Sequence, residues 1–368
     1  MKIKTILNEI EQFAPSYYQE NYDNCGIQVG NAQIECNGVL ITLDITENVL
    51  NEAIAMGCNL IVAHHPLIFS GLKKITGKNY VERVIMKAIK HDIVLYAAHT
   101  NIDNVKNGVN AKIAEKIGLI NTKILAPSRS HKLCKFNTYV PIGLADQVKE
   151  AIFSVGGGKI GNYSECAFEM TGVGTFKPSD SANPKIGEPG GIREQVKEVK
   201  IEALIPEYLS NSVLQAVRNV GFYEEVAYEL IPLQNTDQNI GAGMIGELKQ
   251  PMELMVFLSH LKQAMKTDVI KFTPINGISE IKTVALCGGS GSFLYPTAQQ
   301  QSADIFITAD YKYHQFFEAE NDTIIADIGH YESEQYTVEI FYDILIGKFP
   351  NFAVILSSTN TNPINYFI

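Results

Sequence analysis

The stretch NLIVAHHPLIFSG, residues 59–71, contains the features from which both the fold and the site can be argued. Its opening run NLIVAH is apolar and has the length of a buried β-strand. His64 and His65 stand side by side at the end of this run, and Pro66 follows at once. Proline cannot donate to a strand ladder, so the backbone turns there and both imidazoles can be directed into one crevice. For an isolated pair, one buried and bonded histidine beside an exposed one is the simpler alternative.

Strands and helices alternate on both sides of this stretch. In the first third we expect strands at 38–44, 59–64 and 93–98 and helices at 46–57, 80–91 and 107–118, with Thr46 as an N-cap. In the last third we expect strands at 282–289, 304–310 and 322–329 and helices at 293–301, 311–320 and 330–347, with 352–357 closing the sheet. This order predicts an α/β fold of βαβ units, in which two similar lobes with mostly parallel sheets, 1–125 and 235–368, form one discontinuous domain.

The middle of the chain, residues 126–234, has a different order. It reads as strand, helix, strand, a Pro/Gly-rich loop at 177–191, and then strand, helix, strand. Two such βαβ halves make the ferredoxin-like α+β arrangement. We therefore expect a separate domain inserted into the α/β domain.

Composition limits the partners and the compartment. The 368 residues carry a net charge of −10 and contain no basic run, so duplex nucleic acid is an unfavourable partner. The six cysteines form no C-x-x-C pair, which argues against a disulfide framework and fits a reducing compartment. No apolar run approaches the roughly 20 residues that span a bilayer, and acidic residues interrupt the N-terminal stretch where a signal peptide would be apolar. A cytoplasmic location without a membrane partner is expected.

Two further strand ends carry potential metal ligands. His99 and Asp103 follow strand 93–98, and His330 follows strand 322–329 with Glu334 four residues on. Residues four apart share one face of a helix, so His330 and Glu334 could bind one ion while Glu332 faces away from it. Half of the eight histidines thus fall at strand ends. Ligands bind at the carboxyl ends of parallel strands, so we expect these groups to converge.

The candidate ligands at these strand ends are more numerous than one catalytic zinc requires, because such a zinc uses three protein ligands and a water. His64, His65 and His330 with Asp103 and Glu334 suit two divalent ions per chain, with His99 in reserve. Nitrogen and oxygen donors without thiolate favour zinc first, with manganese, iron or cobalt as alternatives.

Asp44, Asp310 and a glycine-rich stretch each allow a functional and a structural interpretation. Asp44 and Asp310 also stand at strand ends and could orient a ligand histidine or accept a proton, whereas helix capping is the simpler interpretation. With His99, they are the candidates for catalytic or supporting roles next to the ligands. The stretch CGGSGSF, residues 287–293, could form a backbone nest for phosphate or a tight turn near the metal site.

Five motifs together resemble the Nif-three-like family, whose members are often called GTP cyclohydrolase I type 2 homologues. They are YDNCGIQVG (22–30), AHHPLIF (63–69), HTNID (99–103), GGSG (288–291) and GHYESE (329–334). The resemblance covers the whole chain, and the insert resembles the P-II-like (CutA-like) domain of the long bacterial members. It implies a dinuclear divalent-metal site built from His64, His65, Asp103, His330 and Glu334, and a toroidal homohexamer whose sites face an internal cavity.

Two classes of function follow from these patterns. The first is a hydrolase in which water activated by two metal ions attacks a nucleotide-like or phosphate-containing substrate. The second is a non-catalytic metal-binding regulatory or scaffold hexamer, suggested by analogy with the sensing roles of P-II-like domains. Turnover of a substrate panel would separate the two.

Overall fold

A computed structural model describes the chain except for residues 274–278, 320–322 and 368. The chain divides into two compact units. One comprises Met1–Pro127 with Asn239–Ile368, and the other comprises Ser128–Gln238. The insert expected from the sequence spans 126–234. Among the described helices, none combines the length and the apolar character needed to cross a membrane. The mixed α/β class expected from the sequence is confirmed, with several sheets.

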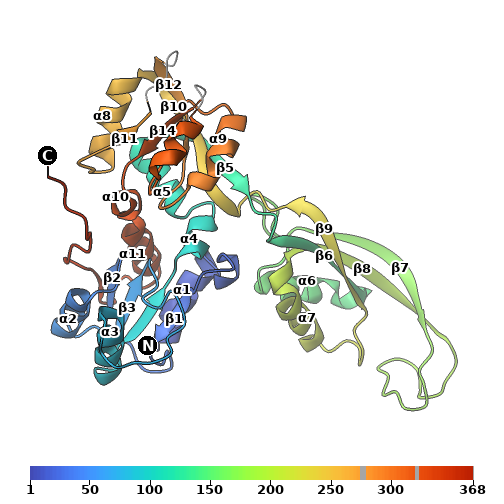
Figure 1. Ribbon diagram of the computed structural model, residues 1–368. Helices are drawn as coiled ribbons and strands as arrows, with labels where there is room; N and C mark the ends of the chain where they lie inside the picture. Colours follow the sequence, from blue (N-terminus) through green and yellow to red (C-terminus); the bar gives the residue numbers. More distant parts are fainter. Residues whose placement is uncertain (274–278, 320–322, 368) are drawn as a thin grey trace. The chain divides into compact units, whose positions relative to one another are not determined.

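The first sheet of the larger unit is mainly parallel (Figure 1). Its strand order is β1 (Gly26–Val29), β4 (Val94–Ala97), β3 (Leu60–Ala63), β2 (Val39–Thr42) and β15 (Val354–Leu356). Only β1, at one edge, runs antiparallel to its neighbour. Every residue of β2, β3 and β4 is buried, as their apolar sequences VLIT, LIVA and VLYA require of strands covered on both faces.

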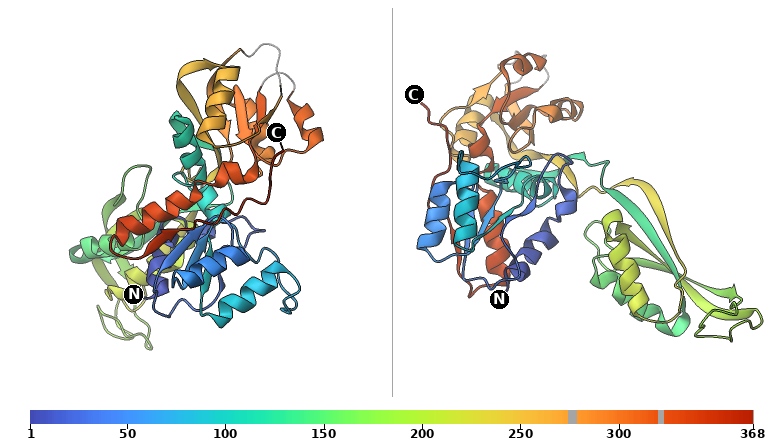
Figure 2. Two further views of the ribbon diagram at one scale, coloured as in Figure 1. Left: turned by 90° about the vertical axis from the view of Figure 1, so that its left-hand side faces the viewer. Right: turned by 60° about the horizontal axis from the view of Figure 1, so that its bottom comes forward.

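Helices cover both faces of this sheet (Figures 1 and 2). On one face α2 (Glu47–Ala55) contacts α3 (Tyr80–Lys90), and their apolar residues join those of the strands in one core. On the other, α1 (Ile3–Phe13) contacts α11 (Thr337–Lys348). The expected cap of α2 is confirmed, because the hydroxyl of Thr46 accepts a hydrogen bond from the amide of Val49.

The second sheet of this unit is mixed. Its order is β11 (Lys271–Phe272), β14 (Ile324–Asp327), β13 (Ile305–Thr308), β12 (Glu280–Leu286), β10 (Gly241–Glu253) and β5 (Ile120–Pro127). The pairs within β12, β13 and β14 are parallel, and the remaining pairs are antiparallel. The expectation of a mostly parallel sheet is therefore wrong for this second sheet, in which antiparallel pairs predominate. The helices α5 (Val109–Ile117), α8 (Leu254–Ala264) and α9 (Tyr295–Gln300) contact it.

The two sheets exchange elements, which the sequence pattern did not predict. Strand β5 follows the first-sheet elements in the chain yet pairs with β10 of the second sheet. Residues 352–357 were expected to close the second sheet, but β15 pairs with β2 of the first. Helix α11 explains this, because its apolar residues Ile340, Phe341 and Leu345 are buried and it contacts β2, so the strand that follows reaches that edge.

Two of the expected helices differ locally. The helix expected over 330–347 is broken into α10 (His330–Glu334) and α11, with a change of direction between them (Figure 1). The helix expected over 311–320 is a 3₁₀ helix, η5 (Tyr313–Glu318). Short 3₁₀ pieces often replace α-helix where a segment is too brief to build regular i→i−4 bonding.

The smaller unit has its own sheet and core. Its elements in chain order are β6 (Lys132–Pro141), α6 (Ala145–Ser154), β7 (Ala167–Phe176), β8 (Glu194–Pro206), α7 (Ser210–Asn219) and β9 (Tyr228–Thr236). The strands are ordered β7-β8-β6-β9 and every pair is antiparallel. Helices α6 and α7 contact each other, and the core joins Phe136 and Ile201 of the sheet to Val148 and Val217 of the helices.

Deleting the smaller unit should leave the larger one folded. Strands β5 and β10, which flank it, pair antiparallel with Pro127 opposite Gly241, so the two cut ends already lie together. Replacing residues 128–238 by a short Gly/Ser linker creates a hairpin with little loop-closure cost. We expect a cooperative thermal transition and an unchanged metal content by elemental analysis. Loss of metal from a folded, soluble deletion variant would show that the smaller unit contributes to metal binding.

Candidate metal centre

The histidine pair lies where β3 ends and the regular alternation of a strand is lost. The amides of His64 and His65 both donate to the carbonyl of Leu43, at 3.2 and 3.0 Å. Successive residues of a regular strand point to opposite sides, so two neighbouring amides cannot share one acceptor there. The chain turns instead, and the two imidazole rings lie 4.8 Å apart.

The other candidate ligands come from two further strand ends. His99 follows β4 and begins the turn into α4 (Thr100–Asn104), which carries Asp103. His330 and Glu334 lie on α10, which follows β14 of the second sheet. The carboxyl ends of parallel strands from both sheets thus supply side chains to one place, as expected for ligand sites in α/β folds.

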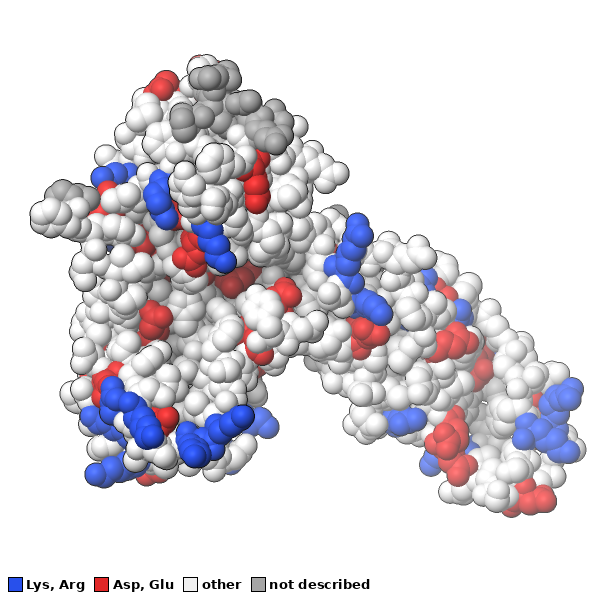
Figure 3. All heavy atoms as spheres, viewed as in Figure 1, with Lys and Arg blue, Asp and Glu red and all other residues white. Residues whose placement is uncertain are grey.

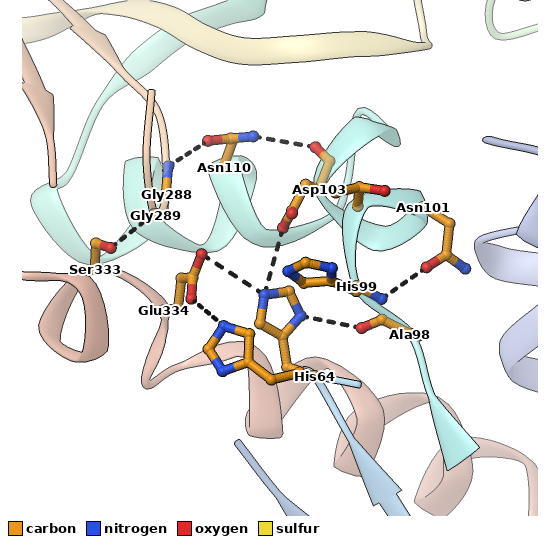
Figure 4. A network of polar contacts seen from close by, with 12 residues as sticks. His64, Ala98, His99, Asn101, Asp103, Asn110, Gly288, Gly289, Ser333 and Glu334 are labelled. Atoms are coloured by element: carbon orange, nitrogen blue, oxygen red, sulfur yellow. Dashed lines mark hydrogen bonds and ion pairs between the residues drawn. The ribbon is translucent and has the colours of Figure 1, made fainter. Parts of the chain in front are cut away.

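One group of donors surrounds the Nε2 atom of His64. That atom lies 3.8 Å from Oδ1 of Asp103 and 3.7 Å from Oε1 of Glu334. Figure 4 shows the imidazole of His64 directed toward both carboxylates. Among the described residues, His64 Nε2 and Asp103 Oδ1 are buried without a hydrogen-bond partner. Buried polar atoms are almost always paired, so this orphaned pair fits a group that both atoms would coordinate.

A second group of donors shares Glu334 with the first. Its Oε2 lies 2.9 Å from Nε2 of His65 and 3.0 Å from Nε2 of His330, and the two nitrogens are 3.3 Å apart. Ligands of one tetrahedral zinc at about 2.0–2.1 Å lie roughly 3.3 Å from each other, so these separations match. Glu334 offers one carboxylate oxygen to each group, and the donor set fits two cations bridged by that residue.

Each of these histidines uses its other ring nitrogen on a fixed acceptor. Nδ1 of His65 contacts Asp44 at 2.7 Å, and Nδ1 of His330 contacts Asp310 at 2.7 Å. Nδ1 of His64 contacts the carbonyl of Ala98 at 3.0 Å. An acceptor at Nδ1 fixes the tautomer and leaves Nε2 as the ligand atom, which is the usual support for metal-binding histidines.

Asp44 and Asp310 therefore do not cap helices. Thr46 caps α2, and the carboxylates of both aspartates are committed to histidines. His99 has the same arrangement, with its Nδ1 2.8 Å from Asp23. It also forms a third possible group of metal donors with His64 and His65.

The glycine-rich stretch is a tight turn against Glu334. The amide of Gly288 donates to Asn110 Oδ1 and that of Gly289 to Ser333 Oγ, at 3.0 and 2.9 Å. These donors are used within the protein, which argues against the phosphate nest. Gly289 has φ +61°, and a Cβ there would lie 2.3 Å from Glu334 Oε1. Glycine is required both for the backbone conformation and for the space that the carboxylate occupies.

The carboxylates and imidazoles at the centre shift one another's pKa values. Burial, together with the negative charge of Glu334, raises the pKa of Asp103. Burial opposes ionisation of Glu334 too, but the neighbouring imidazoles of His64, His330 and His65 hold its pKa well below the usual value. Burial would lower the pKa of His65, yet hydrogen bonds to Asp44 and Glu334 raise it to about 10. The carboxylates therefore draw positive charge to the positions where cations would lie.

Glu332 is directed away from these donors, as expected. Its Oε1 accepts a hydrogen bond from Nδ2 of Asn362 at 3.0 Å, and it belongs to none of the possible metal-binding groups among the described residues. Helix α10 begins at His330, so the i, i+4 spacing that brings His330 and Glu334 together applies.

Three supporting residues were missed by the sequence reasoning. Asp23 lies inside the motif YDNCGIQVG and holds His99. Asn110 also donates to the backbone carbonyl of Asp103 at 3.1 Å, and so links that ligand's turn to the glycine loop (Figure 4). Thr361 donates to Asp44 at 2.6 Å. Asp23 could have been found because it lies in one of the five family motifs, whereas Asn110 and Thr361 lie outside all of them.

The sequence and the fold match a known class of proteins. The sequence model of the family described as Duf34/NIF3 (NGG1p interacting factor 3) matches residues 1–363. The chain therefore belongs to the Duf34/NIF3 family, as the sequence motifs indicated.

Relatives of full length support this assignment. Proteins named GTP cyclohydrolase 1 type 2 homolog from Halalkalibacterium halodurans and Bacillus subtilis are 38% and 37% identical to the chain. The alignments cover 99% and 98% of this chain and 98% and 97% of those proteins. A Bacillus cereus protein related to NIF3 has a similar crystal structure, with a TM-score of 0.87, 36% identity and coverage of 100% of this chain and 99% of that one.

Glu334→Gln should weaken metal binding far more than Glu332→Gln. Glutamine keeps the size of the side chain but removes the charge and one of the two oxygens that face the donor groups. We expect the metal affinity of Glu334→Gln to fall by at least about tenfold. Competition with a chromophoric chelator measures this, and elemental analysis gives the ratio of metal to protein.

Glu332→Gln is the matched control, because the variant keeps an oxygen that can accept from Asn362. Equal losses of metal in the two variants, or a greater loss in Glu332→Gln, would contradict the geometry described above.

Proposed function

We propose that the protein is a hydrolase that depends on two divalent metal ions. His64, Asp103 and Glu334 would hold one ion, and His65, His330 and Glu334 the other. The observation that carries the proposal is the Glu334 carboxylate, whose two oxygens face two separate sets of donors. Bridged pairs of metal ions in proteins are mainly used for hydrolysis and related transfers.

The donor chemistry limits which metals fit. The described donors are imidazole nitrogens and carboxylate oxygens, which suit zinc first and manganese, iron or cobalt as alternatives. Two such ions, when bound, would lower the pKa of a water molecule and polarise the bond that it attacks.

His99 is the candidate for moving a proton. Asp23 accepts from its Nδ1, so the Nε2 atom is left for the pocket, and its side chain is 16% exposed. A positioned histidine with one nitrogen fixed by a carboxylate is a common general acid or base. Asp44 and Asp310 instead position His65 and His330, because their carboxylates already accept from those rings.

The resemblance supplies the remaining parts of the proposal. We propose a toroidal homohexamer with the sites facing an internal cavity and a cytoplasmic location. The βαββαβ order and the antiparallel sheet of the smaller unit support its assignment as a P-II-like insert. The name of the relatives from H. halodurans and B. subtilis supports a nucleotide-like substrate.

Turnover decides between this proposal and the non-catalytic scaffold. Protein loaded with zinc or manganese is tested on nucleotides, phosphodiesters and cyclic amides. We expect hydrolysis of at least one class, abolished in His65→Ala. His99→Gln should lower turnover by roughly a hundredfold or more, the usual contribution of general acid–base catalysis. Saturable binding without turnover across the panel would favour the scaffold.

A further inference from the structure

A cavity of about 530 Å³ lies over the candidate metal centre. His65, His99, Asp103, His330 and Glu334 line it together with residues that the proposed chemistry does not use. Several of the latter carry aromatic rings, namely Tyr22, Phe69, Phe293 and Tyr331. The volume is in the range of sites for small organic molecules, so the wall of the cavity bears on substrate choice.

Three of these rings are largely exposed. Tyr22, Phe69 and Phe293 are 66%, 54% and 67% exposed. The rings of Tyr22 and Phe69 lie 6.5 Å apart, and the ring of Phe69 lies 6.2 Å from that of His99. Tyr22, Phe69 and His99 therefore form a row of neighbouring rings in the cavity wall. Exposed apolar groups that gather at a cavity usually mark a binding surface.

Apart from histidines, the charged side chains among the described residues that line the cavity are all carboxylates. Among the described residues that line it there is no Lys or Arg, whereas Glu20, Asp44, Asp103 and Glu334 are present. The amide of Gly288, which lines the cavity, and that of the neighbouring Gly289 are already bonded. On the face drawn in Figure 3, Lys and Arg gather mainly at the lower end of the larger unit.

We propose that this cavity takes an uncharged, planar heteroaromatic ring stacked on Phe69, and that phosphate groups do not contribute to its recognition. The proposal rests on the hydrolase function and specifies its substrate class. Stacking suits the flat side chains, and the ring edge can reach the donors because Phe69 lies against His99. A polyphosphate would place several negative charges beside the acidic lining with only the metal ions to offset them.

Equilibrium binding tests this independently of turnover. Calorimetry with metal-loaded protein compares a purine nucleoside, its 5′-monophosphate, its 5′-triphosphate and ribose 5-phosphate. We expect the nucleoside to bind, ribose 5-phosphate not to bind, and added phosphates to leave the affinity equal or weaker. Phe69→Leu should weaken nucleoside binding by about tenfold, the usual loss of a base–aromatic stack.

Phe168→Leu is the matched control, because Phe168 is 60% exposed on β7 of the smaller unit and does not line the cavity. Affinity that rises with each phosphate, or equal affinities in Phe69→Leu and Phe168→Leu, would overturn the proposal. Ring-dependent binding without turnover would retain this proposal and refute the hydrolase.

The C-terminal segment provides a second, independent observation. Ser357, Ser358 and Thr359 all donate to Glu52, which fixes the start of the segment on α2. Thr361 then donates to Asp44 Oδ2 at 2.6 Å, while Asp44 Oδ1 contacts His65 Nδ1 at 2.7 Å. The segment thus reaches a candidate ligand through two hydrogen bonds.

We infer that Thr361 is a positioning residue for the metal held by His65. Its hydroxyl holds the Asp44 carboxylate that contacts Nδ1 of His65, whose Nε2 lies 2.9 Å from Glu334. Loss of that bond lets the carboxylate rotate and weakens only the ion that His65 binds. Outer partners of ligating histidines commonly change metal affinity by about 10–100-fold, and a residue one bond further out should change it less.

Chelator competition that resolves the two binding steps tests this inference. Thr361→Val should weaken one ion by about threefold to tenfold and leave the other unchanged. Thr361→Ser should restore the affinity, because it keeps the hydroxyl. Thr359→Val is the matched control, since Thr359 bonds Glu52 and does not contact Asp44. Equal effects of Thr361→Val and Thr359→Val, equal weakening of both ions, or failure of Thr361→Ser to restore the affinity would overturn the inference.

Discussion

The buried carboxylate of Glu334 is the constraint on which the rest of the candidate centre depends. Its side chain is 4% exposed and lies within reach of three imidazoles, those of His64, His65 and His330. A buried charge is costly unless it is paired, so the surroundings must supply positive charge on both sides of it. Room for the carboxylate comes from Gly289, where any side chain would collide with it. The histidines thus compensate the charge of Glu334, and the glycine loop leaves space for its carboxylate.

The exchange of elements between the two sheets brings these groups together. His64, His65 and Asp103 follow strands of the first sheet, and His330 and Glu334 follow β14 of the second. Helix α11 and strand β15 then return to the first sheet directly after Glu334. Strand β5 crosses in the other direction, into the second sheet. The short α10 is therefore held between two segments that are fixed on different sheets, which restricts where its carboxylate can lie.

Much of this arrangement was accessible from the sequence, for identifiable reasons. Apolar runs that end in His or Asp predict strand ends with ligands, and the spacing of His330 and Glu334 predicts one helical face. The strand positions, the cap at Thr46 and the convergence of the five donors follow from such local patterns.

The rest depends on contacts between distant segments. The apolar pattern of a strand does not indicate which other strand it pairs with, so the pairing of β15 with β2 was not predictable. Thr361 lies 317 positions from the Asp44 that it bonds, and a lone threonine carries no signal of such a contact. Asp44 and Asp310 contact the Nδ1 atoms of His65 and His330 across 21 and 20 positions of sequence, so no local pattern links these pairs.

Anomalous X-ray diffraction from crystals grown with zinc tests the central claim most directly. The account predicts two anomalous peaks per chain, one on each side of the Glu334 carboxylate, with His64 and Asp103 beside one and His65 and His330 beside the other. A single peak at saturating zinc, or two peaks of which neither contacts Glu334, would contradict it.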